Sequence, residues 1–262
     1  MTSTAAARRP ITELPHDPSY VQVNYGLETS LGGDPHESTI ERWSVSAGVG
    51  EDFDLDHIPA CAACLDRWAR VEKTSGFVDE EDDCPHRLHV GEFVFYKVRW
   101  DGGMNPFWAM EEETQELYEI AEAVFNDERN DFNEEFNEIV EMHLGGSDLL
   151  VLDRAQLAPL WRGFNLGPIL AAEAIRRLAG GCGAVLVHPA PAEAEDLTSD
   201  QWKHARERLR DTWAKVGFVP YSDTPYMVLS TCWADPEQRH AELQKELKLL
   251  SAQWQAARRA GS

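Results

Sequence analysis

The 262-residue sequence predicts a mixed α/β fold, in which helices flank both faces of one central mixed sheet. Two observations lead to this fold class. From residue 149 onward, patterns typical of strand, helix, strand, helix and strand follow one another. A strand, a helix and a second strand in succession usually form a unit with parallel strands. The first half of the chain adds further strand patterns and two amphipathic helix patterns.

Strands are expected where β-prone apolar residues alternate with polar ones or run together. The strand predicted over residues 88–100 contains Gly91, which is typical of a bulge. Residues 184–187 are apolar throughout, as expected for a central strand covered on both faces. The other expected strands are residues 21–25, 41–46, a strand that begins at Ser147 and Asp148, and 226–230.

Helices are expected where apolar residues recur with helical spacing. Ser199 is predicted to cap one of these helices, and Gly180 with Gly181 is predicted to end another. The expected helices are residues 57–73, 117–124, 132–140, 166–179, 199–215 and 235–260.

The same patterns suggest how the chain is divided. Residues 1–18 are expected to form a loose N-terminal arm, residues 19–233 a single domain, and residues 234–262 a C-terminal helix. That helix has one apolar side, which either packs on the domain or contacts a partner chain. A homodimer through the C-terminal helix therefore stays open.

The composition limits the classes of partner. The formal net charge of −22 argues against nucleic acid and against an anionic membrane, because both bind a basic face. A cationic partner, such as a polyamine or a lysine side chain, is compatible with this charge, although solubility alone also explains it. The chain has no apolar run near the ~20 residues that span a bilayer, and its N-terminus lacks the apolar core of a signal peptide. We therefore expect a cytoplasmic protein.

One group of cysteines and histidines supplies enough ligands for zinc. Cys61, Cys64, Cys84, His86 and His89 have suitable side chains. Their spacing is poor, however, and only one Cys-x-x-Cys pair is present. Buried or incidental thiols are the preferred interpretation, and no metal site is assigned.

The segment 149–170 carries the clearest chemical signal. An apolar strand leads through a short turn, residues 162–167, directly into a helix. Unpaired amides and the helix dipole favour an anion at such a point, and phosphate is the usual one. Arg162 adds a positive charge, and Gly163 and Gly167 let the backbone approach a ligand closely. Pro168 suits the first helical position, where its missing N–H costs nothing.

Residues 148–231 resemble the acetyl-CoA-binding core of the GNAT superfamily of N-acetyltransferases. In that family the turn reads Arg/Gln-x-x-Gly-x-Gly/Ala, and Arg162 and Gly167 match its first and last positions. Asn165 replaces the usual middle Gly and tolerates a left-handed backbone well. Pro168 is a second departure, because it removes one amide. The later motif Trp213-Ala-Lys-Val-Gly-Phe218 is similar to the family's Tyr-x-x-Leu-Gly-Phe.

The resemblance implies a partly splayed sheet and direct transfer of an acetyl group from acetyl-CoA to an amine. It assigns the acceptor side to residues 19–147 and the coenzyme-binding core to residues 148–233. The acceptor is expected to be a small-molecule or peptide amine. The residues expected to bind the coenzyme are Leu157, Arg162, Gly163, Phe164, Asn165, Leu166 and Gly167.

The expected catalytic groups are Asp153, as a base, and Tyr221, as an acid. Tyr221 is considered because Trp213, which cannot act as an acid, stands where the family has its tyrosine. Tyr226 is equally near in sequence, and departure of the thiolate without an acid is a further alternative. His188 is a further candidate for proton transfer. The alternative for Asp153 is a structural role, in which it pairs with Arg154 or caps a neighbouring turn. The other interpretation of the whole chain is a non-catalytic coenzyme A-binding or protein-interaction module with the same fold.

Overall fold

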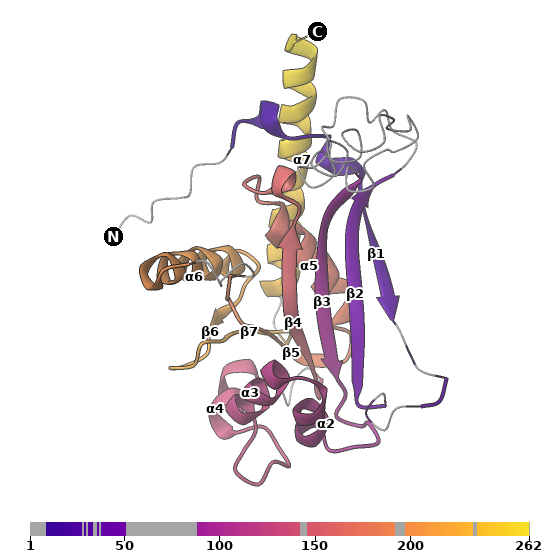
Figure 1. The fold of residues 1–262 in the computed structure, drawn as a ribbon, viewed down its shortest axis with the longest axis vertical. Helices are drawn as coiled ribbons and strands as arrows, with labels where there is room; N and C mark the ends of the chain where they lie inside the picture. Colours follow the sequence, from indigo (N-terminus) through magenta and orange to yellow (C-terminus); the bar gives the residue numbers. More distant parts are fainter. Residues whose placement is uncertain are drawn as a thin grey trace, which may run out of the picture.

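The computed structural model describes residues 9–27, 29, 31–33, 36, 38–50, 88–141, 146–191, 197–232 and 235–261. It confirms the mixed α/β class, because seven strands form one open sheet in the order β1-β2-β3-β4-β5-β7-β6 (Figure 1). Among the described strands, only β4 and β5 pair in parallel. The strands are Val21–Leu27 (β1), Ile40–Val49 (β2), His89–Val98 (β3), Asp148–Leu157 (β4), Cys182–Val187 (β5), Val219–Pro220 (β6) and Met227–Ser230 (β7).

Helices cover both faces of this sheet. The α-helices are Pro106–Glu113 (α2), Gln115–Val124 (α3), Glu134–Val140 (α4), Leu166–Leu178 (α5), Ser199–Ala214 (α6) and Asp235–Gly261 (α7). Short 3-10 helices lie at Ile11–Glu13 (η1), Pro18–Tyr20 (η2) and Pro159–Trp161 (η4).

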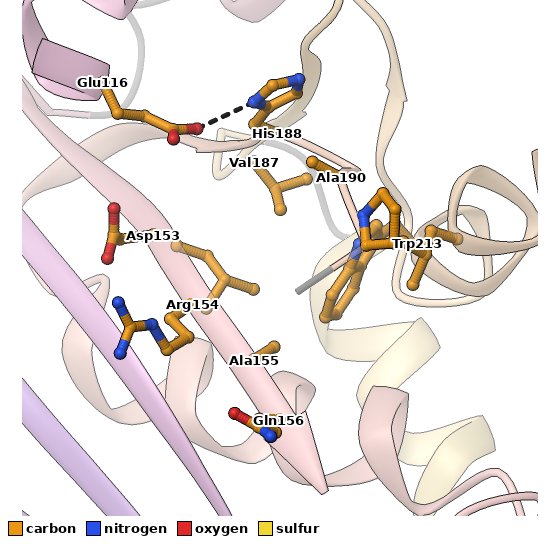
Figure 2. Close-up of a pocket in the computed structure, with 12 residues that line it drawn as sticks. Glu116, Asp153, Arg154, Ala155, Gln156, Val187, His188, Ala190 and Trp213 are labelled. Atoms are coloured by element: carbon orange, nitrogen blue, oxygen red, sulfur yellow. Dashed lines mark hydrogen bonds and ion pairs between the residues drawn. The ribbon is translucent and has the colours of Figure 1, made fainter. Parts of the chain in front are cut away.

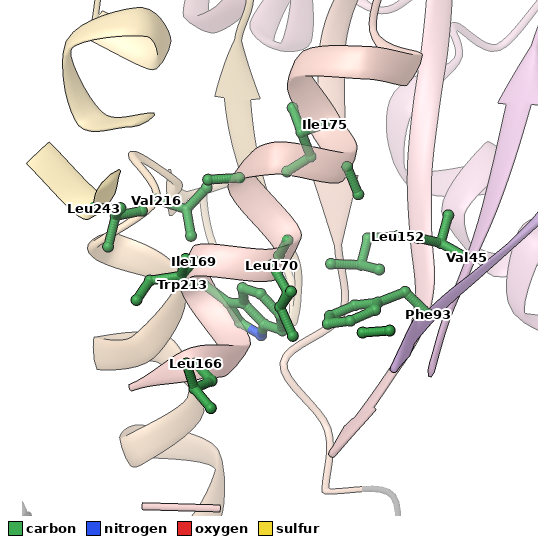
Figure 3. Close-up of a cluster of buried hydrophobic side chains, with 14 of the residues drawn as sticks. Val45, Phe93, Leu152, Leu166, Ile169, Leu170, Ile175, Trp213, Val216 and Leu243 are labelled. Atoms are coloured by element: carbon green, nitrogen blue, oxygen red, sulfur yellow. The ribbon is translucent and has the colours of Figure 1, made fainter. Parts of the chain in front are cut away.

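Alternation along β4 separates the two cores. Leu150 and Leu152 belong to the first core, a cluster that they form with side chains of α5 and α7. Figure 3 shows part of this core. Leu149 and Val151 point to the opposite face and belong to the second core, where they pack with α2, α3 and α4. Successive side chains of a strand point to opposite faces, so one apolar strand supplies both cores.

Most expected elements are present, with three differences. Helix α2 begins after Asn105, whose side chain accepts a hydrogen bond from the Phe107 amide, and it was not expected. The two-residue strand β6 was not expected either. Thr198, rather than Ser199, caps α6, because its hydroxyl and the Gln201 side chain form a capping box. The helix expected over residues 57–73 lies outside the described residues.

The N-terminal segment differs from its expected role as a loose arm. Residues 9–18 pack against the domain, and Leu14 is only 1% exposed. The indole Nε1 of Trp254 on α7 donates to the Leu14 carbonyl at 3.0 Å, and the Gln255 amide donates to Asp17 at 2.7 Å. A buried leucine and two long-range hydrogen bonds thus hold this segment in place.

Helix α7 packs on its own chain. Its Leu243 and Leu250 are buried with α5 in the first core, and its contacts also include η1 and η2. Figure 1 shows α7 alongside α5, with the C-terminus beyond the end of the sheet. The apolar side expected to face either the domain or a partner is therefore occupied within the chain. In the described part of the chain, none of the helices combines the length and apolar character needed to span a membrane.

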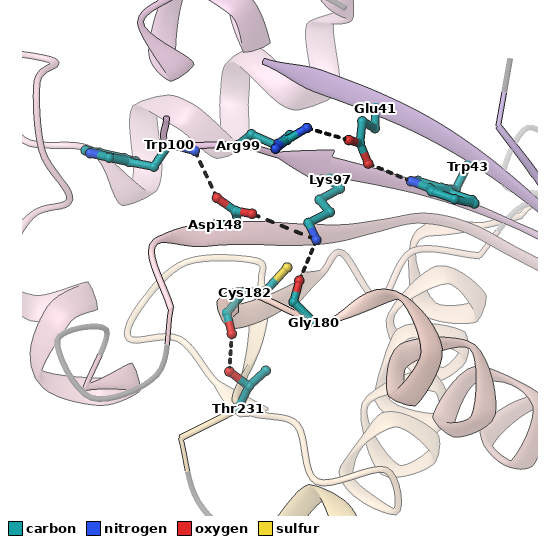
Figure 4. A network of polar contacts seen from close by, with 9 residues as sticks. All are labelled: Glu41, Trp43, Lys97, Arg99, Trp100, Asp148, Gly180, Cys182 and Thr231. Atoms are coloured by element: carbon teal, nitrogen blue, oxygen red, sulfur yellow. Dashed lines mark hydrogen bonds and ion pairs between the residues drawn. The ribbon is translucent and has the colours of Figure 1, made fainter. Parts of the chain in front are cut away.

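A polar network joins β4 and β5 at one end of the sheet (Figure 4). One oxygen of Asp148 accepts from the Trp100 amide at 3.0 Å, and the other lies 3.8 Å from the Lys97 ammonium. Lys97 also donates to the carbonyl of Gly180, which immediately precedes the Gly181–Cys182 entry into β5. These contacts hold the starts of β4 and β5 together.

Candidate functional site

At their other end, β5 stops before β4 does. Their parallel pairing runs from Asp148 to Leu152 on β4, and β5 ends at Val187. Strand β4 continues for five further residues, from Asp153 to Leu157, without β5 beside it. An opening therefore lies between this free length of β4 and the loop that follows β5, and we call this opening the splay.

A cavity of about 480 Å³ occupies this splay (Figure 2). In Figure 2, Asp153 and Arg154 lie on the β4 side, with Val187, His188 and Trp213 across from them. Its lining residues are Glu116, 152–156, Val187, His188, Ala190, Pro191, Leu209 and Trp213. Helix α6 therefore closes one wall of the cavity, and α3 contributes a carboxylate.

Asp153 lies at a β-bulge. Val94 of β3 pairs with Arg154, and the next residue, Phe95, pairs with Leu152, so Asp153 is the extra residue of β4. Such a bulge redirects a side chain at the edge of a pairing. Burial, and then the nearby Glu116 carboxylate, raises the pKa of Asp153 above its ordinary value of 3.8. Asp153 makes no hydrogen bond or ion pair with Arg154 among the described residues, so the alternative of a simple pair is not what the structure contains.

His188 and Glu116 form a dyad on the cavity wall. The Nδ1 atom of His188 lies 2.8 Å from Oε1 of Glu116, and the imidazole is 24% exposed. A carboxylate at Nδ1 favours the tautomer whose proton is on Nδ1, which leaves Nε2 as a proton acceptor. The ring of Tyr226 lies edge-on to the imidazole, with centroids 5.3 Å apart. This arrangement is chemically suited to general base catalysis.

The structure does not bring Tyr221 to the cavity. Its side chain is 1% exposed in the second core, and its hydroxyl donates to the Ala123 carbonyl and lies 3.2 Å from Asn133. The structure therefore does not bring Tyr221 together with Asp153, which does line the cavity. Trp213 does line the cavity, but its indole cannot supply a proton as an acid.

The turn after β4 has the backbone expected of an anion site. Gly163 and Asn165 adopt left-handed conformations, with φ of 89° and 65°. Alternation of this kind turns neighbouring amides toward a common side and forms a concave nest for anions. In the described part of the chain, five amides of the turn have no hydrogen-bond partner. They are those of Gly163, Phe164, Asn165, Leu166 and Gly167.

The side chains of the turn have separate roles. Phe164 and Leu166 are each 2% exposed and pack in the core, so only their backbone is available to a ligand. The Asn165 side chain accepts from Lys215 at 2.7 Å and donates to Glu246 of α7 at 2.9 Å. A Cβ atom placed on Gly167 would lie 3.8 Å from the nearest atom, Cδ1 of Leu157, which is an ordinary van der Waals distance.

Leu157 and Arg162 lie where β4 leaves the sheet. The Ala158 amide donates to Val90 of β3, and strand backbone groups alternate in direction. The Leu157 amide therefore faces away from β3, toward the edge that β5 has left. The Arg162 Nε atom donates to the Leu157 carbonyl at 2.7 Å, which holds the guanidinium at the same edge.

Two residues of this region were not predicted to belong to it. Glu116 lies on α3, and only the packing of α3 on the sheet brings it to His188. Arg9 lies in the segment expected to be loose, and its guanidinium contacts the carbonyls of Pro159, Leu160 and Arg162. Neither residue belongs to a local motif that sequence analysis could have used.

No family model matches this chain, and no curated protein matches it at a significant level. Among the described residues, no group of three or more potential ligands could hold a metal ion. Cys61, Cys64, Cys84 and His86 lie outside the described residues. Burial raises the pKa of the Cys182 thiol to about 12, so this cysteine stays protonated and is unsuited to nucleophilic chemistry.

Proposed function

We propose that this protein is an acetyl-CoA-dependent N-acetyltransferase of the GNAT type, which transfers the acetyl group directly to an amine. The observation that carries the proposal is the cavity between the splayed ends of β4 and β5, with the nest of free amides at the end of β4. The amides, the α5 N-terminus and Arg162 would hold the pyrophosphate of the coenzyme. The pantetheine arm would then enter the splay.

The open edge of β4 supports the next step. In acyl transfer, a backbone N–H can stabilise the oxyanion that develops on the thioester carbonyl. The Leu157 amide faces the edge that β5 has left, so it is suited to this task. The acetyl group would then lie between β4 and the loop after β5.

Removal of a proton from the amine is assigned to the dyad. His188 Nε2 would take the proton, and Glu116 would orient the ring and stabilise its positive charge. The amine nitrogen would bond to the acetyl carbon as the C–S bond breaks, and coenzyme A would leave as a thiolate that takes its proton from the imidazolium or from water. Asp153 lies on the opposite wall, and its carboxylate would attract a cationic acceptor to the cavity. The acceptor class proposed here is an amine that is cationic in water, and the reaction is proposed to occur in the cytoplasm.

Binding of the coenzyme is tested by thermal unfolding with and without acetyl-CoA. We expect acetyl-CoA to raise the Tm of the wild-type protein and to leave that of Arg162→Glu unchanged. Arg259→Glu, at the exposed end of α7, changes the net charge equally and should keep the wild-type shift. An unchanged Tm for the intact wild-type protein would falsify the proposed coenzyme site.

One observation favours a second function. Trp213 fills part of the cavity wall where the resemblance leads us to expect a tyrosine, and Tyr221 is buried elsewhere. A protein that binds coenzyme A without turnover, for sensing or for contact with a partner, would need no acid. Release of free thiol from acetyl-CoA in the presence of diamines, polyamines or lysine peptides separates the two functions. Binding without thiol release on every amine would favour the second one.

A further inference from the structure

The N-terminal segment reaches the phosphate-binding turn through Arg9. The Arg9 Nη1 atom lies 3.3 Å, 3.5 Å and 3.4 Å from the carbonyl oxygens of Pro159, Leu160 and Arg162. The Arg9 amide donates to the Gly163 carbonyl at 3.4 Å. Arg9 thus contacts four carbonyls in and before the turn, although it is about 150 residues away in sequence.

The side chain of Arg9 also packs on the turn. Its guanidinium lies 5.3 Å from the centroid of the Phe164 ring, within the range of a cation–π contact. A Cβ atom added to Gly163 would lie 2.9 Å from Cγ and Cδ of Arg9. Gly163 is therefore needed for the close approach of Arg9, as well as for its own left-handed backbone.

These carbonyl contacts determine where the neighbouring amides point. In a trans peptide unit the C=O and the following N–H point in opposite directions, and none of the described peptide bonds is cis. Because the carbonyls of Arg162 and Gly163 are directed at Arg9, the amides of Gly163 and Phe164 are directed away from it. These are the first two of the five turn amides, residues 163–167, that have no hydrogen-bond partner within the described residues.

We propose that Arg9 is a positioning residue of the anion site, which orients the amides of the turn toward the pyrophosphate of coenzyme A. This inference rests on the proposed function. A guanidinium is suited to the task, because it presents several donors in a fixed plane. Pro168 removes one amide from the start of α5, so the remaining amides must be well oriented for tight binding. The loose arm expected from the sequence is thus a part of the coenzyme site.

The rest of the segment holds Arg9 in place. Leu14 is buried in the first core, and its carbonyl accepts from Trp254. Arg9 also pairs with Glu13 at 2.8 Å, but both side chains are exposed, so this pair adds little to the anchoring. Among the described residues, the Glu13 side chain makes no hydrogen bond or ion pair with the turn itself. It therefore offers a control variant that removes the partner of Arg9 but keeps the four carbonyl contacts.

The test is the Kd of acetyl-CoA measured by isothermal titration calorimetry. Arg9→Ala should bind at least about tenfold more weakly than wild type, because a set of charge-assisted contacts is lost. Arg9→Lys, which keeps a positive charge and a long stem, should recover part of the affinity. Glu13→Gln should bind within about twofold of wild type, since its change is confined to an exposed ion pair.

Hydrogen exchange adds a measurement that a purely structural role would not change. In the wild-type protein, acetyl-CoA should slow exchange of the amides of residues 163–167, and Arg9→Ala should lose that protection at a temperature where it is folded. If Arg9→Ala does not fold, the test is the Kd of acetyl-CoA for Arg9→Lys. A Kd equal to that of the wild-type protein would overturn the inference. An unchanged Kd in folded Arg9→Ala overturns this inference alone. A wild-type protein that does not bind acetyl-CoA overturns the proposed function and this inference together.

Discussion

The Nδ1 atom of His188 lies 2.8 Å from Oε1 of Glu116, although the two residues are 72 positions apart in the sequence. His188 follows β5 directly, and Glu116 lies in the first turn of α3. The residue that follows β5 and the first turn of α3 therefore supply one side chain of the dyad each. Its position on the wall of the splay makes it the first group to test for catalysis.

Replacement of His188 should remove the proton acceptor. We expect His188→Asn to lower the rate of thiol release about 10²- to 10⁴-fold, while the Kd of acetyl-CoA stays near the wild-type value. Glu116→Gln keeps the imidazole and should lower the rate less, by about tenfold. Steady-state kinetics with saturating coenzyme measure both effects. Full activity in both variants would assign the base to another group, with Asp153 as the next choice.

Asp153 should reduce the stability of the protein at neutral pH. Burial and the Glu116 charge raise its pKa above 3.8, so the folded protein holds this proton more tightly than the unfolded chain. The stability then falls as the pH rises from about 3.8 through the raised pKa, because the charged form is disfavoured. Asp153→Asn should therefore be more stable than wild type at pH 7. Urea unfolding at pH 7 and near pH 4 tests this, and the difference should shrink at the lower pH.

Glu173 should have the opposite pH dependence. Hydrogen bonds from Arg176, and then from Arg177 and His240, lower its pKa from 4.5 to about 2, despite partial burial. Its ion pairs therefore stabilise the fold fully above pH 4.5, and this contribution is lost as the pH falls toward 2. Because the arginines are largely exposed, the contribution is only about 1 kcal/mol.

The corresponding variant is Glu173→Gln, which weakens the link between α5 and α7 through His240. Its free energy of unfolding at pH 7 should be about 1 kcal/mol below that of wild type. High salt should reduce the difference, since exposed ion pairs are screened. If the free energies of unfolding of Glu173→Gln and wild type differ by the same amount at pH 3 and at pH 7, the charge of Glu173 is not the cause of the difference.

Trp254 should stabilise the N-terminal segment. Trp254→Phe keeps an aromatic ring but removes the Nε1 donor to the Leu14 carbonyl, which should cost about 1 kcal/mol. The midpoint of urea unfolding should fall without a change in slope. Leu249→Ala, also on α7 but 63% exposed, is a suitable control and should leave the midpoint nearly unchanged. Equal midpoints for Trp254→Phe and wild type would contradict this role.

Much of the region from β4 to β5 could be predicted, because its signals are local. The apolar run of β5, the turn conformation at Gly163 and Asn165, and the parallel pairing of β4 with β5 all agree with expectation. Each depends on residues that are close in sequence or on the handed connection between neighbouring strands. The short strand β6 and the weakly amphipathic helix α2 carry little local pattern, and both were missed.

The lining of the cavity could be predicted only in part. Asp153 does line the cavity, but its bulge depends on the register of β3, which has no signature in β4 itself. Tyr221 is near the motif in sequence, yet the chain turns its hydroxyl into the opposite core against Ala123. Proximity in sequence was therefore a poor guide to proximity at the cavity.

The sequence by itself determined the α/β class and the strand, turn and helix of residues 148–178, because hydrophobic periodicity and turn chemistry act over short distances. Only the tertiary structure decided that Glu116 meets His188 and that Arg9 holds the turn. Those contacts join segments 72 to about 150 residues apart. They depend on how both faces of the sheet are packed, which no local pattern encodes.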